Sequence, residues 1–338
     1  MKIWISKESW KSRHADMRMA GIDFADIKNI AVIKHGALGD MVLTRPMLVT
    51  LREHFPNAKI TLSVVSNYVR GIPEDLVDRV HIALGNERTY PRPDILQSYR
   101  SLGPQDILFD ISATTRSFII SKLTAARLKV GYMHRGLHRF IYDVAIPRAE
   151  YRFEAETFLE QVHVLGLDFS WPLDFRPSTA PMQRKRPYLV FFPTASASDK
   201  CWPAERFAEL IRHSIATRPQ FEHVLLCGVA PWEQDIADQI VAAAGSHSVT
   251  LVQGGDLTNS LLAGAELLVA NDTGIRNLAI SLDIPTVGIF PYGSPFGYTP
   301  RFNRHRVVYH ADGSIVDIAE VQQAMDQVLG NQGYAECQ

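Results

Sequence analysis

The stretch at residues 267–290, LLVANDTGIRNLAISLDIPTVGIF, carries the pattern that decides the fold of this chain. Its apolar run at 267–272 predicts a buried strand, and the segment at 274–282 predicts a short helix. A second apolar run at 286–290 follows through Pro285. Strand, helix and strand in this order predict a parallel βα unit, because strands buried on both faces read as continuous apolar runs.

The same alternation recurs along the whole chain, so we predict an α/β protein built from two similar halves. In the first half the strand candidates lie at 29–35, 59–65, 77–83, 106–112 and 127–132, with helices near 45–55, 91–101, 115–126 and 153–165. In the second half the strand candidates lie at 188–194, 223–229, 249–253, 267–272, 286–290 and 304–310, with helices near 203–217, 231–244, 257–264, 274–282 and 315–329.

The length of 338 residues favours two domains, because single cores stop growing near ~250 residues. Residues 171–187, WPLDFRPSTAPMQRKRP, interrupt the pattern with four prolines and a basic cluster, which indicates a linker. We predict an N-terminal extension at 1–28, a first domain at 29–175, a linker at 176–187, a second domain at 188–314, and a C-terminal helix and tail at 315–338. The extension is basic and contains Trp4 and Trp10, and we favour an arm packed on the first domain over a membrane-surface contact.

The composition excludes several classes of protein. With 46% apolar and 21% charged residues the chain is expected to fold, and a net charge of −1 shows no footprint for nucleic acid. The three cysteines are scattered, with neither a disulfide framework nor a metal-binding spacing, which favours a reducing compartment. No secretory signal or membrane-spanning run is evident, so we expect a cytoplasmic protein whose membrane contact, if any, is peripheral, at the inner membrane surface.

The first motif that could carry chemistry is HGALGD, at residues 35–40, between a strand and a helical segment. Its glycines allow the backbone to approach a ligand, but a dinucleotide G-x-G-x-x-G fingerprint is absent, as is a phosphate-binding Lys-Ser/Thr. Asp40 has two interpretations: a carboxylate that caps the helix, or a general base at the carboxyl end of a parallel sheet, where open α/β folds bind ligands. Its spacing alone favours the cap.

Two further motifs follow strands of the second half. PTASASDKCWP, at 193–203, combines small residues with Lys200, whose charge suits a phosphate, although an ordinary solvated lysine is the commoner case. Trp202 should be buried against the sheet. At the third motif, Thr273 and Gly274 open a helix whose unpaired amides could bind an anion, while Asp272 could simply cap it.

A local excess of positive charge distinguishes residues 116–152, which carry eight Lys or Arg side chains against Asp143 and Glu150. A solvated face explains such a segment as well as a rim for a polyanionic partner does.

The three motifs, in this order, resemble the glycosyltransferase family nine enzymes, the ADP-heptose:lipopolysaccharide heptosyltransferases, over roughly residues 29–330. The family opens with G-x-x-G-D and a later Pro, continues with an Arg-Ser after a strand that ends in Asp and with K-x-W-P-x-E, and closes with D-[ST]-G-x-x-H-x-A before a Pro-led strand. The matching positions are Gly36, Gly39, Asp40, Pro46, Asp110, Arg116, Ser117, Lys200, Trp202, Pro203, Glu205, Phe207, Asp272, Thr273, Gly274, Ala279 and Pro285.

The resemblance implies a GT-B architecture, in which two Rossmann-like domains with parallel sheets face a central cleft and the last helix packs back toward the first domain. It implies an inverting transfer of heptose from ADP-L-glycero-D-manno-heptose to a lipopolysaccharide core, without a metal or other cofactor. The catalytic residues would be Asp40 as the base and Lys200 as a cation on the leaving diphosphate. The donor would contact Thr194, Ser196, Lys200, Glu233, Asp272, Thr273, Gly274 and Asn277, and the acceptor would contact Gly39, Arg116, Arg135 and Arg139.

Two departures from the family pattern leave alternatives open. The Gly usual soon after the last strand appears only as Gly293, and Asn277 replaces the usual His of the closing motif. Asn cannot carry charge, so any role of that His in neutralising the leaving diphosphate is lost or is passed to a neighbour such as Arg276. Glu233 matches a ribose-binding acid of the family and fits an ordinary first-turn glutamate equally well. The alternatives are a family member with another nucleotide-sugar or glycan acceptor, and a non-catalytic protein that binds nucleotide-sugars.

Overall fold

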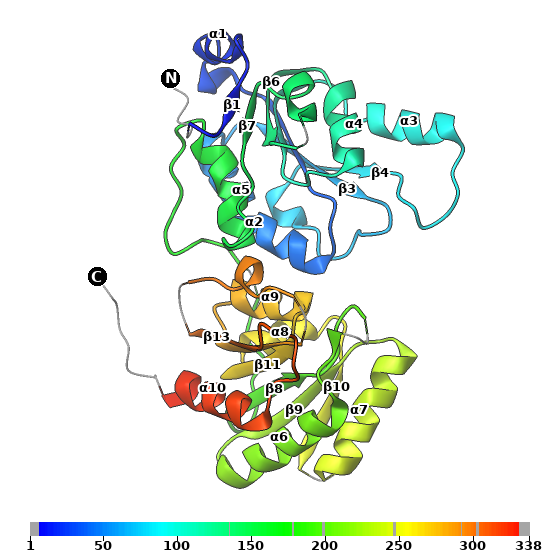
Figure 1. Cartoon of the computed structure of the whole chain (residues 1–338), viewed down its shortest axis with the longest axis vertical. Helices are drawn as coiled ribbons and strands as arrows, with labels where there is room; N and C mark the ends of the chain where they lie inside the picture. Colours follow the sequence, from blue (N-terminus) through cyan, green and yellow to red (C-terminus); the bar gives the residue numbers. More distant parts are fainter. Residues whose placement is uncertain are drawn as a thin grey trace. The chain divides into compact units, whose positions relative to one another are not determined.

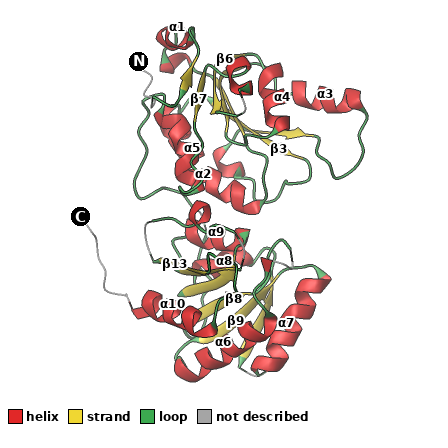
Figure 2. Cartoon of the chain, viewed as in Figure 1, coloured by secondary structure: helices red, strands yellow, loops and turns green. Residues whose placement is uncertain are grey.

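The computed structural model describes residues 7–134, 136–177, 179–197, 200–245, 248–291, 293–301 and 304–330. The chain divides into two compact units, with the boundary between Arg176 and Pro177 (Figure 1). Each unit has its own sheet with helices on both faces, and the strands are parallel except for one short edge strand of the first unit (Figure 2). The prediction of an α/β protein with parallel sheets is therefore confirmed.

The first unit contains a seven-stranded sheet in the order β1-β7-β6-β5-β2-β3-β4. Its strands are β1 (Trp10–Lys11), β2 (Asn29–Ile33), β3 (Lys59–Val65), β4 (Arg79–Ala83), β5 (Gln105–Asp110), β6 (Ala126–Tyr132) and β7 (Val144–Ile146). Its helices are α1 (Ala15–Ala20), α2 (Leu38–His54), α3 (Arg92–Arg100), α4 (Thr115–Leu123) and α5 (Glu154–His163), with short 3₁₀ turns η1 (Phe24–Asp26), η2 (Glu74–Leu76) and η3 (Leu137–Phe140).

The second unit contains a six-stranded sheet in the order β10-β9-β8-β11-β12-β13, parallel throughout. Its strands are β8 (Tyr188–Phe192), β9 (Glu222–Cys227), β10 (Val249–Gln253), β11 (Leu267–Asn271), β12 (Thr286–Phe290) and β13 (His305–Tyr309). Its helices are α6 (Ala204–Thr217), α7 (Pro231–Ala244), α8 (Thr258–Ala263), α9 (Gly274–Ser281) and α10 (Ile318–Gly330), with the 3₁₀ turn η5 (Phe296–Tyr298).

Both sheets have the doubly wound order that reverses direction in the middle. In the first unit the reversal lies between β2 and β5, and in the second it lies between β8 and β11. Open α/β sheets bind ligands outside the carboxyl ends of the strands at this switch point. The three strand-end motifs follow β2, β8 and β11, so the topology places them at the two switch points.

One prediction about the first unit requires correction and another is confirmed. The helix expected at 45–55 begins at Leu38. Proline is common in the first turn of a helix, so Pro46 resembles a helix start. It lies inside α2 instead, where its ring removes a single backbone hydrogen bond. The favoured interpretation of the N-terminal extension, an arm packed on the first domain, is confirmed for its described residues, since β1 pairs with β7 and α1 contacts β6. The strands β1 and β7 were not predicted, because two or three extended residues show no periodicity. The six-residue helix α1 was not predicted either.

The last helix and all of the predicted linker except Arg176 belong to the second unit. Within the predicted linker, the backbone N–H of Met182 donates to the Ser260 carbonyl, 2.8 Å away. The helix α10 buries Val321 and Met325 in the core formed with α6 and α7. The sequence predicted that α10 packs back toward the first domain, whereas its apolar face lies on its own sheet; any further contact with the first domain stays a prediction.

Candidate active site

Asp40 lies in the first turn of α2, directly beyond the carboxyl end of β2. Its Oδ2 accepts a hydrogen bond from the N–H of Ala37, 3.0 Å away, and its Oδ1 lies 2.9 Å from Nζ of Lys34. The Lys34 ammonium also lies 4.4 Å from the centre of the Phe158 ring. Gly36 is required for this arrangement, because a Cβ there would lie 2.4 Å from Oδ2 of Asp40.

The surroundings of Asp40 satisfy both interpretations of this residue. Its bond to Ala37 is a helix cap, while its side chain remains 25% exposed and so can be reached by a solute. The Lys34 side chain is only 5% exposed, so its ammonium is held in place against the Asp40 carboxylate. Each carboxylate oxygen keeps a further lone pair for another donor. Asp40 can therefore cap the helix and still accept a proton from a bound hydroxyl.

Lys34 is the residue that the sequence reading missed at this site. It ends the apolar run IAVIK, where a lysine would ordinarily reach solvent. A charged residue that closes a buried strand next to a functional motif was the available signal. Gly39, predicted to contact the acceptor, is buried in the same first turn of α2.

Arg116 lies at the N-terminal end of α4, which follows β5 at the same edge of the sheet. Its guanidinium donates to the Tyr99 hydroxyl at 3.2 Å and to Oδ1 of Asn86 at 2.8 Å. Burial, with a contribution from the Arg116 charge, lowers the pKa of His35 to about 3. Neither ring nitrogen of His35 has a hydrogen-bond partner among the described residues. Arg116 thus contributes positive charge near His35, at the end of β2, and its contact with an acceptor stays a prediction.

Asp110, the aspartate that ends β5, is a structural residue. Its side chain is fully buried and accepts hydrogen bonds from the Tyr142 hydroxyl at 2.6 Å and the N–H of Ser112 at 2.9 Å. Burial raises the pKa of this carboxyl, although these bonds oppose the rise. It fixes the turn that leads to Arg116 and cannot reach a ligand.

Arg139, another predicted acceptor residue, is not placed beside Asp40. Arg139 lies in η3 and lines a pocket together with Lys122, at the C-terminal end of α4. Arg116 lies at the other end of the same helix, so the basic segment does not form a single surface. Arg135 lies outside the described residues. An acceptor role for Arg135 and Arg139 stays a prediction.

In the second unit, the end of β8 is tied to the start of α7. The Thr194 hydroxyl, which is fully buried, donates to Oε1 of Glu233 at 2.8 Å. Oε2 of the same carboxylate accepts from the N–H of Ala230, and a Cβ at Gly228 would collide with it. Glu233 is therefore a capping residue that also holds Thr194, and a contact with a ribose stays a prediction.

Asn271 connects the loop after β8 to the end of β11. Its side chain accepts from the N–H of Trp202 at 3.1 Å and donates to the Pro193 carbonyl at 2.6 Å. Trp202 is buried as predicted, with its indole N–H on the Val316 carbonyl. The buried Asn271 thereby sets the position of the 193–202 loop. It was missed, although an amide that ends the apolar run LLVA is a readable signal.

Lys200 lies near enough to Asp272 for its charge to act on that carboxyl. Lys200 is exposed, as is Ser196. Burial raises the pKa of Asp272, and the neighbouring charges of Lys200 and Arg276 oppose that rise. The structure thus brings together the lysine of the second motif and the aspartate of the third.

The helix α9 begins at Gly274, with Thr273 as its extended N-cap residue. No side-chain hydrogen bond caps this helix. The first amides of a helix have no partner within it, so they are available to an anion. The start of α9 and the Lys200 ammonium are therefore the groups of this unit suited to a diphosphate.

Arg276 does not replace the family histidine at the surface. Its side chain is 1% exposed and donates to the Tyr298 carbonyl at 2.8 Å, under a space left by Gly288. Burial lowers its pKa to about 10, so the guanidinium stays charged at neutral pH. The suggestion that Arg276 contacts a leaving group is wrong, because its side chain points into β12 and η5. Asn277 is also buried, at 4% exposed.

Among the described residues there is no cluster of three His, Cys, Asp or Glu side chains that could hold a metal ion. Within the described residues, the groups near the carboxyl ends of the strands that could stabilise negative charge are cationic side chains and helix amides. The expectation of metal-independent chemistry stays a prediction.

The profile of glycosyltransferase family 9 (heptosyltransferase) matches residues 95–322, which is more than half of the chain. The chain belongs to this glycosyltransferase family. The family assignment and the prediction of a glycosyltransferase are thereby confirmed.

Curated relatives of this family 9 glycosyltransferase share low identity over most of their length. The lipopolysaccharide core heptosyltransferase OpsX of Haemophilus influenzae is 21% identical over 298 residues, covering 83% of this chain and 84% of the relative. The lipooligosaccharide heptosyltransferase 2 of Campylobacter jejuni is 24% identical over 285 residues, covering 81% and 85%.

The solved structure of Escherichia coli heptosyltransferase WaaC with ADP-2-deoxy-2-fluoro heptose superposes with a TM-score of 0.71 at 22% identity. The match covers 88% of this chain and 99% of that one. It shows that this family 9 enzyme shares the GT-B fold of the heptosyltransferases.

Proposed function

We propose that this family 9 glycosyltransferase transfers heptose from an ADP-heptose to the core of a lipopolysaccharide, with Asp40 as the general base. The observation that supports this proposal most directly is the position of the Asp40 carboxylate. Lys34 and the N–H of Ala37 hold it at the switch point of the first sheet, and part of it stays exposed. The names of the relatives, which are lipopolysaccharide and lipooligosaccharide heptosyltransferases, support the sugar and the acceptor class.

The proposed reaction is a single displacement with inversion. The acceptor hydroxyl gives its proton to a free lone pair of Asp40 as its oxygen forms a bond to the anomeric carbon. The bond from that carbon to the diphosphate oxygen breaks, and ADP leaves with the electron pair. Charge that develops on the diphosphate is stabilised by Lys200 and by the amides at Thr273 and Gly274. No metal is required in this scheme.

The remaining predicted residues are assigned to binding. Thr194, Ser196 and Glu233 lie along the donor side of the second unit, where Glu233 would contact the ribose. Arg116 and the backbone at Gly39 would contact the acceptor in the first unit. We also propose a cytoplasmic location, in keeping with the scattered positions of the three cysteines in the sequence.

A second candidate function rests on Asn277, which is buried where the family pattern has histidine. A neutral amide at this position favours an enzyme of the same family with a different nucleotide-sugar or glycan acceptor. Thermal-shift titration with ADP, UDP and GDP distinguishes the two: preferential stabilisation by ADP supports heptose transfer from an ADP donor, whereas preference for UDP or GDP supports the second candidate.

The role of Asp40 is tested by Asp40→Asn, which keeps a hydrogen-bond acceptor for Ala37. We expect turnover to fall by about 10²- to 10⁴-fold, as for loss of a general base, with unchanged ADP affinity. The matched control is Asp78→Asn, because Asp78 also accepts from one amide (Ile60) and one cation (Arg52), at 2.7 and 2.6 Å. Turnover of Asp40→Asn close to that of the control would reduce Asp40 to a helix cap.

A further inference from the structure

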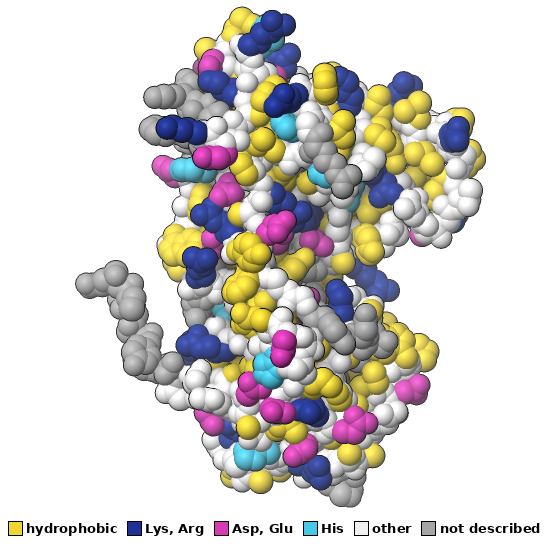
Figure 3. Space-filling view, viewed as in Figure 1, with side chains coloured by type: hydrophobic (Ala, Val, Ile, Leu, Met, Phe, Trp, Pro, Cys, Tyr) yellow, Lys and Arg dark blue, Asp and Glu magenta, His cyan; other side chains and the backbone are white. Residues whose placement is uncertain are grey.

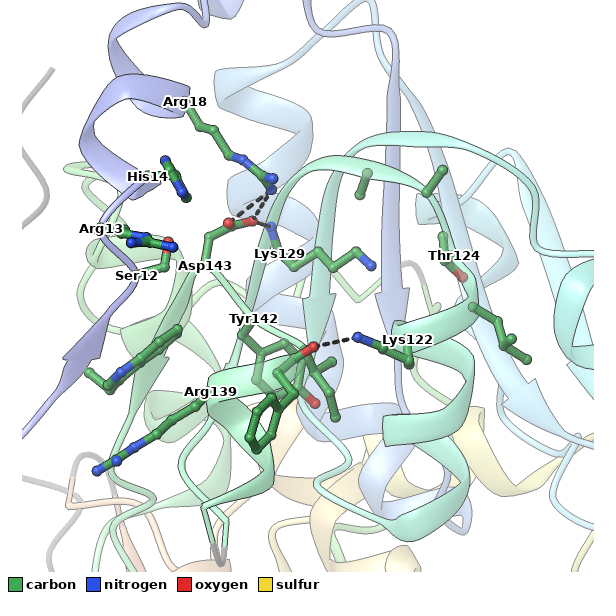
Figure 4. A pocket seen from close by; sticks show the side chains of 16 residues that line it. Ser12, Arg13, His14, Arg18, Lys122, Thr124, Lys129, Arg139, Tyr142 and Asp143 are labelled. Carbon is green, nitrogen blue, oxygen red and sulfur yellow. Dashed lines mark hydrogen bonds and ion pairs between the residues drawn. The ribbon is translucent and has the colours of Figure 1, made fainter.

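A pocket of about 710 Å³ lies in the first unit, away from the residues proposed for transfer (Figure 4). It is open to solvent and is lined by the segment that carries β1 and α1, by the C-terminal end of α4, and by residues 139–143 before β7. Arg116 lies at the N-terminal end of α4, so the helix separates this pocket from the edge of the sheet that carries Asp40.

The pocket is strongly basic. Five of its lining residues are cations: Arg13, Arg18, Lys122, Lys129 and Arg139. The single carboxylate among the lining residues is that of Asp143, which accepts two hydrogen bonds from Arg18 at 2.9 and 3.0 Å. Four positive charges therefore remain without a carboxylate of the pocket to balance them.

Most of these cations are available to a ligand. The ammonium groups of Lys122 and Lys129 each donate to a neutral carbonyl, at 2.8 and 2.7 Å, and the Asp143 carboxylate acts favourably on the charge of Lys129. Among the described residues, the side chains of Arg13 and Arg139 make no hydrogen bond or ion pair. Burial lowers the pKa of Lys129, and an anion beside it would favour its charged form.

The pocket also contains an unsatisfied donor. The hydroxyl oxygen of Ser12 is buried and has no hydrogen-bond partner within the described part of the chain. Buried hydroxyls almost always have a partner, so this group is free to donate to an oxygen of a ligand in the pocket. Serine hydroxyls and basic side chains are groups that bind phosphate.

Apolar side chains border the same pocket. Phe140 is 73% exposed and Leu123 is 37% exposed, although both line the pocket. Leu137 on η3 and Met17 on α1 are exposed close by in the chain. Figure 3 shows apolar side chains next to Lys and Arg side chains around α1. Exposed aromatic and aliphatic groups beside a basic site are typical of proteins that lie on a membrane.

We propose that this pocket binds the phosphate headgroup of an anionic phospholipid and docks the first unit on a membrane surface. The cations and Ser12 bind the phosphate oxygens, while Phe140 and Leu123 enter the boundary between headgroups and acyl chains. The exposed apolar border favours a lipid over a free anion, since a soluble phosphate has no apolar part that could contact Phe140 and Leu123. The proposal is independent of the sugar that the enzyme transfers.

The test is co-sedimentation of the full-length protein with vesicles of phosphatidylcholine, with or without phosphatidylglycerol. We expect binding only when phosphatidylglycerol is present, and weaker binding at higher salt. The double variant Arg13→Gln/Arg139→Gln should lower the partition coefficient by roughly 25-fold, at about fivefold per charge removed. Phe140→Ser should also weaken binding. The control is Arg92→Gln/Arg100→Gln, which removes two exposed charges on α3, and it should bind as the parent protein does.

Three results would overturn the proposal: equal binding to phosphatidylcholine alone, unchanged binding of the Arg13/Arg139 variant, and no vesicle binding at all. Thermal shifts with inorganic phosphate separate the two sources of the anion. Stabilisation of the parent protein but not of the Arg13/Arg139 variant, without vesicle binding, would show a soluble-anion site and refute membrane docking. Circular dichroism of each variant establishes that it is folded.

Discussion

The substitution Lys34→Met should separate the positioning of Asp40 from the stability of the first unit. Methionine has nearly the length of lysine and suits the buried path beside Phe158, but it cannot bind the carboxylate. Asp40 would then be held only by the N–H of Ala37, and its Oδ1 would be free to turn.

The expected size of the effect follows from the geometry. Two opposite charges ~4 Å apart near a protein surface attract by about 4 kcal/mol. The Asp40 side chain is 25% exposed, so water screens part of this attraction, and burial of the Lys34 charge offsets more of it. We expect a net loss of about 1 kcal/mol in the free energy of unfolding. A misplaced base is far more costly to catalysis, so kcat should fall by about 10- to 100-fold.

The assay measures ADP release at saturating donor and acceptor, with the KM of the donor expected to stay constant because the donor groups lie in the second unit. Arg52→Met is the control. Arg52 lies at the other end of α2 and forms an ion pair with Asp78, so its loss should affect stability alone. In an Asp40→Asn background, Lys34→Met should change kcat by less than about twofold, because residues that act as one unit are not additive. A full loss in that background, or a normal kcat for Lys34→Met, would refute the reasoning.

Three further predictions concern the two units. Gly36→Ala should displace the Asp40 carboxylate and lower kcat without changing ADP affinity, as measured by turnover and by ADP titration. Asn271→Leu should lower the free energy of unfolding by about 2–4 kcal/mol in urea titrations, because it leaves two buried backbone groups of the 193–202 loop unpaired, and it should weaken ADP binding. The pKa of His35 is 6.5 in the unfolded chain and about 3 in the folded protein. As the pH falls below 6.5, protonation of His35 therefore stabilises the unfolded state and lowers the free energy of unfolding. Between pH 6.5 and 5, urea titration of the parent protein should show about 1.5 kcal/mol more loss than that of His35→Gln.

Much of the fold could be predicted because its determinants are local. The strands β3, β10 and β12 lie where continuous apolar runs placed them, and α7 begins at the proline that favours a first helical turn. The start of α2 could not be predicted in this way, since Pro46 mimics a helix start. The antiparallel β1 pairs through only two residues, and such short pairing depends on a distant partner rather than on a pattern.

The site was predicted in part for the same reason. Asp40, Lys200 and Thr273 follow apolar strands, and parallel strands bring their carboxyl ends to one edge of a sheet. The partners of these residues depend on side-chain direction, which spacing along the chain does not encode. Lys34 forms an ion pair with Asp40, and Asn271 donates to the Pro193 carbonyl in the loop after another strand. Neither contact could be derived from the neighbouring sequence motif.

The sequence by itself determined a chain of parallel βα units with three strand-end motifs, because apolar periodicity, caps and turns act over a few residues. Only the tertiary structure decided where charge is placed. It buried Arg276 instead of exposing it, and it put Arg116 and Arg139 toward opposite ends of α4 although a single basic segment contains both. The physical reason is that a helix carries neighbouring residues to opposite edges of a sheet, so proximity in sequence is no measure of proximity in space.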